Sequence, residues 1–252
     1  MSDWNADLYL KYEKQRSQPA WDLAARVSKY APEKIADLGC GPGNSTAILK
    51  SVFPEAQLTG IDNSTAMIEK ARKTHPELDF RLGDLRELEE SYDLIFSNAC
   101  LHWVPDHASL LPALMNRLND RGVLAVQVPM NGREPLYQII RETADQSPYD
   151  FSSAYFEKND VLTPEGYFEI LSSCASGFEI WETVYYHDLP THADLINWVR
   201  SARLRPYLDC LTEAEQKNFE AEILERVKQQ YPVMGNDSVI LKFRRLFFTA
   251  GK

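Results

Sequence analysis

Three glycines stand at alternate positions where an apolar run of the sequence ends. The segment from Ile35 to Thr46 reads IADLGCGPGNST, with glycine at Gly39, Gly41 and Gly43. The apolar residues before the glycines are typical of a short buried parallel strand. Glycine has no Cβ atom, so it lets the backbone turn tightly and approach a ligand closely. The spacing G-x-G-x-G differs from the G-x-G-x-x-G of a dinucleotide site, and it favours S-adenosylmethionine as the ligand.

Polar side chains follow the next predicted strands. Asp62 comes about twenty residues after the glycines, where an acid can accept both hydrogens of a ribose diol. Asp84 is expected to accept from an adenine amino group while Leu85 packs the ring. Asn98 ends a strongly apolar strand. Because ligands of open α/β sheets bind at the carboxyl ends of the strands, we expect these residues to share one site. The strands are predicted over 57–61, 80–82, 92–98 and 122–128.

Capping residues and apolar spacing predict the helices of the first half. Asn44, Ser45 or Thr46 can cap the helix after the glycines, and Ser64 can cap the next one. The buried faces of these two helices are predicted to be Ile48, Leu49, Val52 and Phe53, and Met67, Ile68 and Ala71.

The second half of the chain predicts two further strands and two amphipathic helices. The alternation over 178–187 is typical of an antiparallel strand, and 240–250 is the last predicted strand. The helices are marked by Leu195, Trp198 and Val199, and by Phe219, Ile223 and Val227.

Composition and charge exclude several classes of function. The chain of 252 residues has a net charge of −10 and no basic run, so nucleic acid is a poor substrate. It has no run of about eighteen apolar residues, and its N-terminus lacks a secretory core, so we expect no membrane association and a cytoplasmic location. The four cysteines show no C-x-x-C spacing, which argues against a metal site or a disulfide framework.

The chain resembles the class I S-adenosylmethionine-dependent methyltransferases. The resemblance is carried by DLGCGPGNST, GID, GDL and DLIFSNACLHWVPDH. Within that class it resembles the trans-aconitate 2-methyltransferase family nearly end to end, through YLKYEKQR, GVLAVQVP, YYH, LRPYL and RLF. The resemblance implies an α/β fold, with a Rossmann-like, mostly parallel seven-stranded sheet, helices on both faces, an antiparallel last strand and a helical cap over the strand C-terminal ends.

The expected domain organisation follows from this resemblance. Residues 1–30 form an N-terminal helical lid, and residues 31–129 form the core that binds S-adenosylmethionine. Residues 130–177 and 203–236 are expected to form the cap, whereas 178–202 and 237–252 complete the core sheet.

The resemblance also implies the reaction, which is methyl transfer to a carboxylate of trans-aconitate or a close polycarboxylate. A carboxylate with a pKa near 4 is ionised at neutral pH, so no residue is expected to act as a catalytic base. The protein must align oxygen, methyl and sulfur, and arginine suits the grip on carboxylates that do not react. The substrate is therefore a small acid, S-adenosylhomocysteine is a product, and the protein is expected to be a monomer or a homodimer.

Candidate site residues divide between the two ligands. An N-terminal helix supplies Tyr12 and Arg16 for the amino-acid end of the cofactor. The residues expected to bind S-adenosylmethionine are Tyr12, Arg16, Asp37, Gly39, Gly41, Asn44, Asp62, Asn63, Met67, Asp84, Leu85, Asn98 and Ala99. Those expected to bind the acceptor acid are His102, Trp103, His187, Arg205 and Arg245.

Three departures from the family pattern leave the identity of the acid open. His102 replaces the usual glutamine, Met130 replaces an acid, and Arg203 lies two residues before Arg205 where glycine is usual. A malonyl-thioester or fatty acid is the alternative acceptor. A nicotinamide oxidoreductase or a nucleoside-binding protein without catalysis is the alternative from another class. Adjacent strand residues point oppositely, so only one of each pair Arg244/Arg245 and Tyr185/Tyr186 is expected to face the pocket.

Overall fold

The structure of the protein is a computed structural model that describes residues 13–155 and 161–252. The described residues fall into two compact units. The larger unit holds residues 14–129, 161–183 and 245–252, and the smaller unit holds residues 13, 130–155 and 184–244. Across the described ranges, no helix combines the length and apolar composition that crossing a membrane requires.

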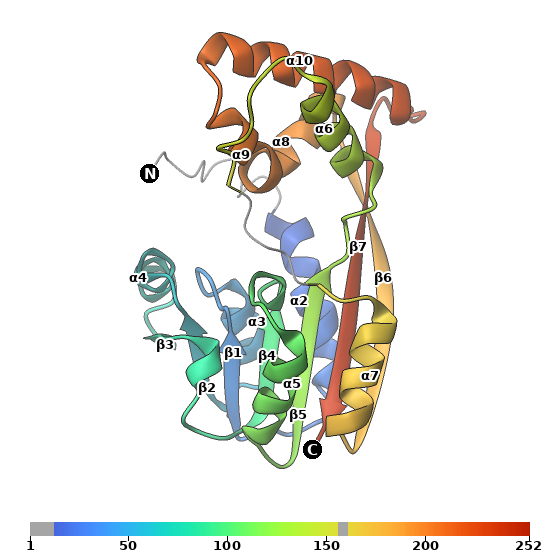
Figure 1. The fold of residues 1–252 in the computed structure, drawn as a ribbon. Helices are drawn as coiled ribbons and strands as arrows, with labels where there is room; N and C mark the ends of the chain where they lie inside the picture. The colour runs from blue at the N-terminus through green and yellow to red at the C-terminus, as the bar shows by residue number, and fades with distance from the viewer. Residues whose placement is uncertain (1–12, 156–160) are drawn as a thin grey trace. The chain divides into compact units, whose positions relative to one another are not determined.

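A seven-stranded sheet in the order β3-β2-β1-β4-β5-β7-β6 organises the larger unit (Figure 1). Strands β1 to β5 pair in parallel, and β7 runs antiparallel to β5. The predicted Rossmann-like sheet with an antiparallel last strand is therefore confirmed. The strands are β1 (Lys34–Leu38), β2 (Gln57–Asp62), β3 (Asp79–Leu82), β4 (Tyr92–Asn98), β5 (Leu118–Pro129), β6 (Gly177–Leu189) and β7 (Val239–Gly251).

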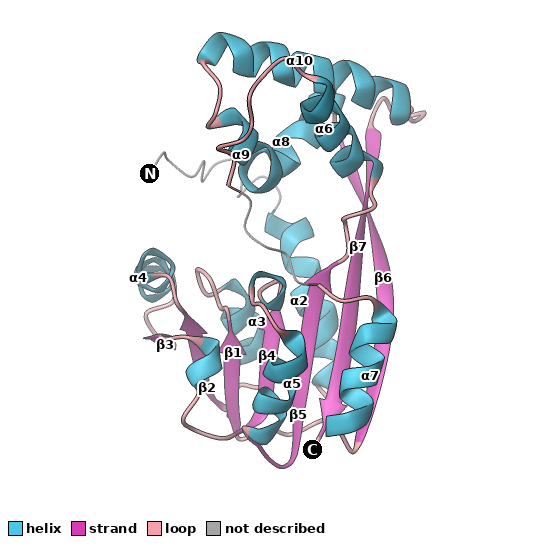
Figure 2. Cartoon of the chain, in the orientation of Figure 1, coloured by secondary structure: helices cyan, strands magenta, loops and turns pink. Residues whose placement is uncertain are grey.

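Helices cover both faces of this sheet. Helices α2 (Glu13–Val27) and α3 (Asn44–Val52) lie on one face, and α5 (His107–Asn116) and α7 (Pro164–Cys174) lie on the other (Figure 2). Helix α4 (Thr65–Thr74) packs against β2 and β3. Two 3₁₀ turns follow strand ends, and they are η1 (Leu85–Glu87) after β3 and η2 (Leu101–Trp103) after β4.

The helix after the glycines begins differently from the prediction. The residue before α3 is Gly43, with φ of 93°, and no side chain caps the helix. Ser45 and Thr46 instead donate their hydroxyls to the carboxylate of Asp37, at 2.6 and 2.7 Å. The buried carboxylate of Asp37 on β1 competes for these hydroxyls, so the local capping rule was wrong here. Ser64 does cap α4, as predicted, by accepting the Met67 N–H.

The smaller unit is mainly helical and has its own apolar core. It contains α6 (Pro135–Gln146), α8 (His192–Val199), the π-helical turn η3 (Arg200–Leu204), α9 (Arg205–Leu208) and α10 (Glu213–Gln230). Phe219, Ile223 and Val227 are fully buried on α10, and Leu195, Trp198 and Val199 are buried on α8. Both amphipathic helices were therefore predicted correctly. Their expected position as a cap over the strand ends stays a prediction.

The division into units differs from the expected ranges at α7. Residues 130–177 were grouped as one segment, but α7 belongs to the larger unit. Its Tyr167 is fully buried, bonds to His107 of α5 and packs its ring 5.3 Å from that of Phe248 on β7. This packing ties α7 to the sheet.

Candidate functional site

The glycine turn after β1 has the left-handed backbone that its sequence requires. Gly39, Gly41 and Gly43 have φ values of 70°, 54° and 93°. The Gly39 and Cys40 N–H groups donate to the Ile61 carbonyl at the end of β2, at 2.8 and 3.1 Å. Residues that carry a Cβ atom have a steric penalty at such φ values. The turn is thus fixed by hydrogen bonds to the neighbouring strand.

Gly39 and Gly41 are needed for different reasons. A Cβ atom on Gly39 would lie 2.1 Å from the Cys100 sulfur, so packing excludes any side chain there. A Cβ on Gly41 would meet nothing within 4 Å, so the space above this residue is open.

Burial raises the pKa of the Cys100 thiol to about 12, and it also raises the pKa of Cys40. Neither thiol is therefore a nucleophile at neutral pH.

Asp62 holds the turn from the end of β2. Its Oδ2 accepts the Gly41 N–H at 3.0 Å, and its Oδ1 accepts the Ser64 N–H at 2.9 Å. Each carboxylate oxygen has a second lone pair available, so Asp62 can accept from a ligand as well. The structure thus brings together the glycine turn and the acid that the sequence predicted.

Asp37, at the end of β1, is fully buried with one oxygen left over. Its Oδ2 accepts from Ser45 and Thr46, whereas Oδ1 has no hydrogen-bond partner in the part of the chain that the structure describes. Burial raises the pKa of Asp37 to about 6, and the two hydroxyls partly oppose this rise. A buried carboxylate oxygen without a partner calls for a donor from a ligand.

Asp84 and Leu85 follow β3, but their side chains are already engaged. Asp84 accepts from the backbone and side chain of Arg86, and this hydrogen bonding lowers the pKa of the carboxyl group. Leu85 is buried. Leu82, which the sequence analysis did not single out, is 55% exposed and pairs with Asp62 across the strands. It is the apolar surface beside the acid expected to hold the ribose.

The ends of β4 and β5 meet at a second group of polar residues. Asn98 pairs with Gln127 in the parallel register, and the Ala99 N–H donates to the Gln127 carbonyl at 3.0 Å. Ala99 has a positive φ of 53°, which turns the chain sharply after β4. The Asn98 Oδ1 atom is buried with no hydrogen-bond partner in the described ranges. Gln127 was missed by the sequence analysis because it lies inside an apolar run.

His102 and Trp103 lie in the turn η2, which a buried pair supports. His102 is buried and its ring lies 4.4 Å from that of Trp103, which is 40% exposed. The His107 Nε2 donates to the Leu101 carbonyl, and its Nδ1 accepts from the Tyr167 hydroxyl, both at 2.8 Å. A carbonyl only accepts, so these contacts fix the tautomer of His107.

Arg245 belongs to the same unit as the glycine turn. It is 8% exposed and pairs with Pro129 in the β5–β7 register, whereas Arg244 is exposed. In an antiparallel pair directly opposite residues share a face, so Arg245 lies on the face that carries Gln127 and Phe247. Of the two arginines, Arg245 is the one whose side chain is buried against this unit.

His187 and Arg205 lie in the smaller unit. His187 is buried, with its ring stacked 4.6 Å from Trp198, and Tyr185 stacks beyond it. Tyr186 is 63% exposed, so the pair divides as adjacent strand residues must. The Nε atom of Arg205 lies 3.5 Å from Oδ2 of Asp209. The candidate acceptor residues thus fall in both units.

The remaining predicted residues differ in exposure. Asn44, the first residue of α3, and Met67 are partly buried, and Asn63 is exposed. Arg16 lies on α2 with partial burial, and Tyr12 lies outside the described residues. Arg203, one of the departures from the family pattern, places its guanidinium 5.6 Å from the centre of the Tyr137 ring within the smaller unit.

These residues fit the expected S-adenosylmethionine. Asp37 Oδ1 and Asn98 Oδ1 are buried acceptors without a described partner at the ends of the paired strands β1 and β4. An amino-acid ammonium is a donor that complements both oxygens. The open space above Gly41 leaves room for a ligand to approach the backbone. Asp62 and the exposed Leu82 offer a hydrogen-bond acceptor and an apolar surface for a nucleoside.

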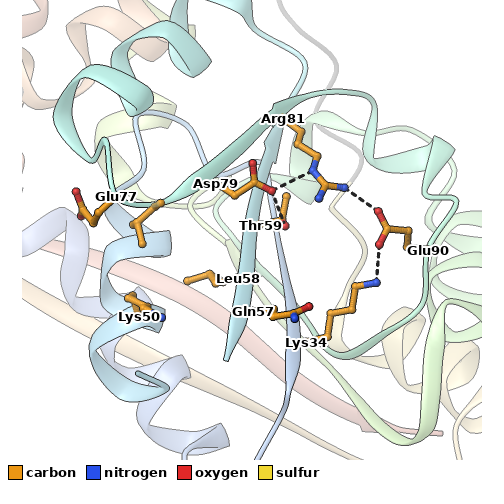
Figure 3. Close-up of a pocket in the computed structure, with 10 residues that line it drawn as sticks. Lys34, Lys50, Gln57, Leu58, Thr59, Glu77, Asp79, Arg81 and Glu90 are labelled. Carbon is orange, nitrogen blue, oxygen red and sulfur yellow. Dashed lines mark hydrogen bonds and ion pairs between the residues drawn. The ribbon is translucent and has the colours of Figure 1, made fainter. Parts of the chain in front are cut away.

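A hollow of about 380 Å³ at the amino ends of β1, β2 and β3 is a different feature (Figure 3). Four of its charged residues pair with one another: Glu90 bonds to Lys34 and Arg81, and Asp79 bonds to Arg81. The hollow lies at the opposite ends of these strands from the glycine turn, and these ion pairs already engage much of its charge. It is therefore not the expected ligand site.

Comparisons with known proteins agree with this geometry. Residues 35–122 match the methyltransferase domain family. The trans-aconitate 2-methyltransferase of Escherichia coli O7:K1 is 44% identical over 252 residues, covering 99% of this chain and 98% of that protein. The protein of the same name from Shigella flexneri is also 44% identical over the same coverage.

Two solved structures share the fold at low identity. The YcgJ protein of Bacillus subtilis has a TM-score of 0.61 and 12% identity, covering 93% of this chain and 98% of that chain. The O-methyltransferase from a multienzyme of Brevibacillus brevis, solved with S-adenosylhomocysteine, has a TM-score of 0.53 and 14% identity, covering 100% and 81%. At such identities the likeness shows the architecture alone, and that architecture is the predicted one.

Proposed function

The chain belongs to the trans-aconitate 2-methyltransferase family, and on that basis we propose that it methylates one carboxylate of trans-aconitate or of a closely similar polycarboxylate. It is an S-adenosylmethionine-dependent methyltransferase, and the product ester forms together with S-adenosylhomocysteine. The nicotinamide oxidoreductase and the non-catalytic nucleoside-binding protein, which the sequence alone left open, do not agree with this family.

One observation carries the choice of acceptor, and it is the extent of the similarity. The methyltransferase domain match ends at residue 122, whereas the 44% identity extends over 99% of the chain. Methyltransferase domains share their cofactor turn, so residues beyond that match are the ones free to select the acceptor. The candidate acceptor residues His187, Arg205 and Arg245 all lie beyond it.

The donor side of the larger unit supplies binding and orientation. S-adenosylmethionine, when bound, provides a sulfonium methyl group that is already activated for transfer. Asp62 is assigned to the ribose hydroxyls, and Asp37 and Asn98 to the ammonium group. The turn through Gly39 and Gly41 lets the backbone lie close to the ligand.

The acceptor needs positioning rather than proton transfer. A carboxylic acid with a pKa near 4 is ionised at neutral pH, so its oxygen is ready to attack without a base. The reacting oxygen must lie about 3 to 3.5 Å from the methyl carbon, in line with the sulfur. Arg205 and Arg245 are assigned to the carboxylates that do not react, because a guanidinium grips a carboxylate in two places. His102, Trp103 and His187 are assigned to the rest of the pocket.

The test is turnover against a panel of acids. The purified protein is incubated with S-adenosylmethionine and trans-aconitate, cis-aconitate, isocitrate, a malonyl thioester or a medium-chain fatty acid. S-adenosylhomocysteine and the ester are then measured by mass spectrometry. Preferred turnover of trans-aconitate supports the proposal. Turnover of only the malonyl thioester or the fatty acid contradicts it and transfers the proposal to an acceptor with less charge.

A further inference from the structure

Gln127 has a buried side-chain amide whose nitrogen and oxygen both lack a hydrogen-bond partner among the described residues. The residue is fully buried on β5, and neither its Nε2 nor its Oε1 has a hydrogen-bond partner in the described part of the chain. An amide buried without partners costs folding free energy, and such groups are rare in native proteins. A glutamine at this position inside an apolar strand therefore calls for an explanation other than stability.

The position of Gln127 in the sheet points to the acceptor side of the site. It is level with Asn98, the last residue of β4, and it shares a face with Arg245. Asp62, assigned to the ribose, ends β2, and the order β2-β1-β4-β5 puts three strand spacings between the two strands. At about 4.8 Å per spacing, Gln127 lies roughly 14 Å from the ribose end. The acceptor must lie beyond the methyl group, on this side of the sheet.

Helix α2 covers the same face. Phe247, the cross-strand partner of Gln127, stacks on Trp181 with ring centres 5.3 Å apart. The Arg26 guanidinium of α2 lies 5.0 Å from the centre of the Trp181 ring. The Gln127 amide is shielded from water, and a hydrogen bond made in such surroundings is stronger than in water.

We propose that Gln127 holds the reacting carboxylate of the acceptor acid, while Arg245 holds a carboxylate that does not react. The Nε2–H group donates to one carboxylate oxygen, and the other oxygen forms the new bond to the methyl carbon. The carbon–sulfur bond breaks, its electron pair stays on sulfur, and no proton moves. The oxygen bonded to Gln127 becomes the ester carbonyl and keeps the hydrogen bond.

The chemistry of the two side chains supports this division. A guanidinium withdraws charge from the carboxylate that it binds, so it would weaken the attacking oxygen. A neutral amide orients the carboxylate through a weaker bond and leaves more of its charge available. This inference rests on the proposed function, since it takes a polycarboxylate as the acceptor.

The experiment compares Gln127→Met with the wild-type protein. Methionine has a similar shape but no amide, so the open polar groups disappear with little change in packing. Titration calorimetry measures binding of trans-aconitate to the protein saturated with S-adenosylhomocysteine, and binding of S-adenosylhomocysteine alone. Thermal unfolding without ligands gives the stability. We expect acceptor affinity to fall roughly 10- to 100-fold, as for a lost substrate hydrogen bond.

The same variant should keep its affinity for S-adenosylhomocysteine and unfold at the same or a higher temperature. A side chain with a structural role would lower the unfolding temperature instead. Thr143→Val is the matched control, because Thr143 is also fully buried and its hydroxyl has no described partner. It should match the stability change and leave acceptor binding unchanged.

The outcomes separate this inference from the proposed function. Wild-type turnover of trans-aconitate with unchanged acceptor binding in Gln127→Met overturns the inference alone. An equal loss of acceptor and S-adenosylhomocysteine affinity also overturns it, since Gln127 would then serve the cofactor. A wild-type protein that neither binds nor methylates any polycarboxylate overturns the proposed function, and the inference with it.

Discussion

In the larger unit, the polar side chains at the ends of β1 and β2 differ from those at the ends of β4 and β5 in their hydrogen bonding. On the β1–β2 side, Asp62 accepts from Gly41 and Ser64 with both oxygens, and the protein itself fixes the turn. On the β4–β5 side, the amide groups of Gln127 have no described partner. In the proposal above, the protein itself fixes the glycine turn that holds the donor, whereas the Gln127 amide makes its hydrogen bond only to the acceptor acid. Four substitutions, from the largest expected effect to the smallest, test this contrast.

Gly39→Ala should distort the glycine turn and abolish binding of S-adenosylhomocysteine. The new Cβ would lie 2.1 Å from the Cys100 sulfur, at a φ of 70°. The left-handed conformation and the overpacking together should cost about 2 to 5 kcal/mol of unfolding free energy. Chemical denaturation measures this loss, and calorimetry should find no binding of S-adenosylhomocysteine.

Gly41→Ala is the matched control for that variant. Its Cβ meets nothing within 4 Å, so only the backbone penalty of about 1 to 2 kcal/mol applies. Ligand affinity should still fall, because the methyl group occupies the open space. Equal loss of stability in both variants would argue against the packing difference between the two glycines.

Asp62→Ala should weaken the ligand more than it weakens the fold. The Gly41 and Ser64 N–H groups lose their acceptor, and the ribose hydroxyls lose theirs. The two lost hydrogen bonds to the ribose hydroxyls correspond to roughly a 100-fold loss of affinity for S-adenosylhomocysteine. The KM for the acceptor at saturating S-adenosylmethionine should change little. A selective rise in that KM would show that Asp62 serves the acceptor and not the cofactor.

Asp37→Asn tests whether the buried carboxylate of Asp37 binds the cofactor at the expense of stability. Burial raises the pKa of Asp37 from 3.8 to about 6, so the folded state binds this proton more tightly than the unfolded state. The resulting stability is fully present below about pH 4 and is lost as the pH rises through about 6. The shift corresponds to about 3 kcal/mol at most.

Asparagine still accepts from Ser45 and Thr46 but carries no charge. The amide NH2 group takes the place of Oδ1, where no described residue accepts from it, so its burial offsets the stability gained by removing the buried charge. The variant should therefore lose the pH dependence of its stability between about pH 4 and 6. Its affinity for S-adenosylhomocysteine should fall about 10-fold, because the NH2 group cannot accept from the ammonium of the ligand. Urea unfolding at several pH values and calorimetry give both quantities, and a pH dependence that persists in the variant would contradict the argument.

Tyr167→Phe should have the smallest effect. It removes the hydroxyl that donates to His107 Nδ1 and leaves that nitrogen buried without a partner. The expected cost is about 1 to 2 kcal/mol of unfolding free energy, with little change in kcat. Tyr155→Phe is the control, because Tyr155 is 77% exposed. A large loss of acceptor binding would instead make the His107–Tyr167 pair part of the acceptor side.

The sequence predicted the donor side because backbone conformation there depends on residue type. Glycines mark the left-handed turn, and Asp62 follows an apolar strand at a typical distance. The roles of Ser45 and Thr46 were wrong because a tertiary contact with Asp37 overrides the local capping rule. The cap of α4 by Ser64, in contrast, follows the local rule.

The acceptor side depends on contacts that no local pattern encodes. Gln127 stands in an apolar run, and its proximity to Asn98 and Arg245 comes from strand pairing. Burial of Arg245 and exposure of Arg244 follow from the register of β7. The bond between His107 and Tyr167 joins residues 60 positions apart.

The close packing of Cys100 against Gly39 has a further consequence for thiol chemistry. Burial raises the pKa of Cys100 to about 12, so its thiolate is scarce at neutral pH, and its sulfur is pressed against the glycine turn. An alkylating reagent attacks the thiolate, so we expect the partly exposed Cys100 to be labelled slowly while the turn is packed against it. The labelling rate of Cys100 therefore reports on the packing of the turn, and a bound ligand that covers the turn should slow that rate.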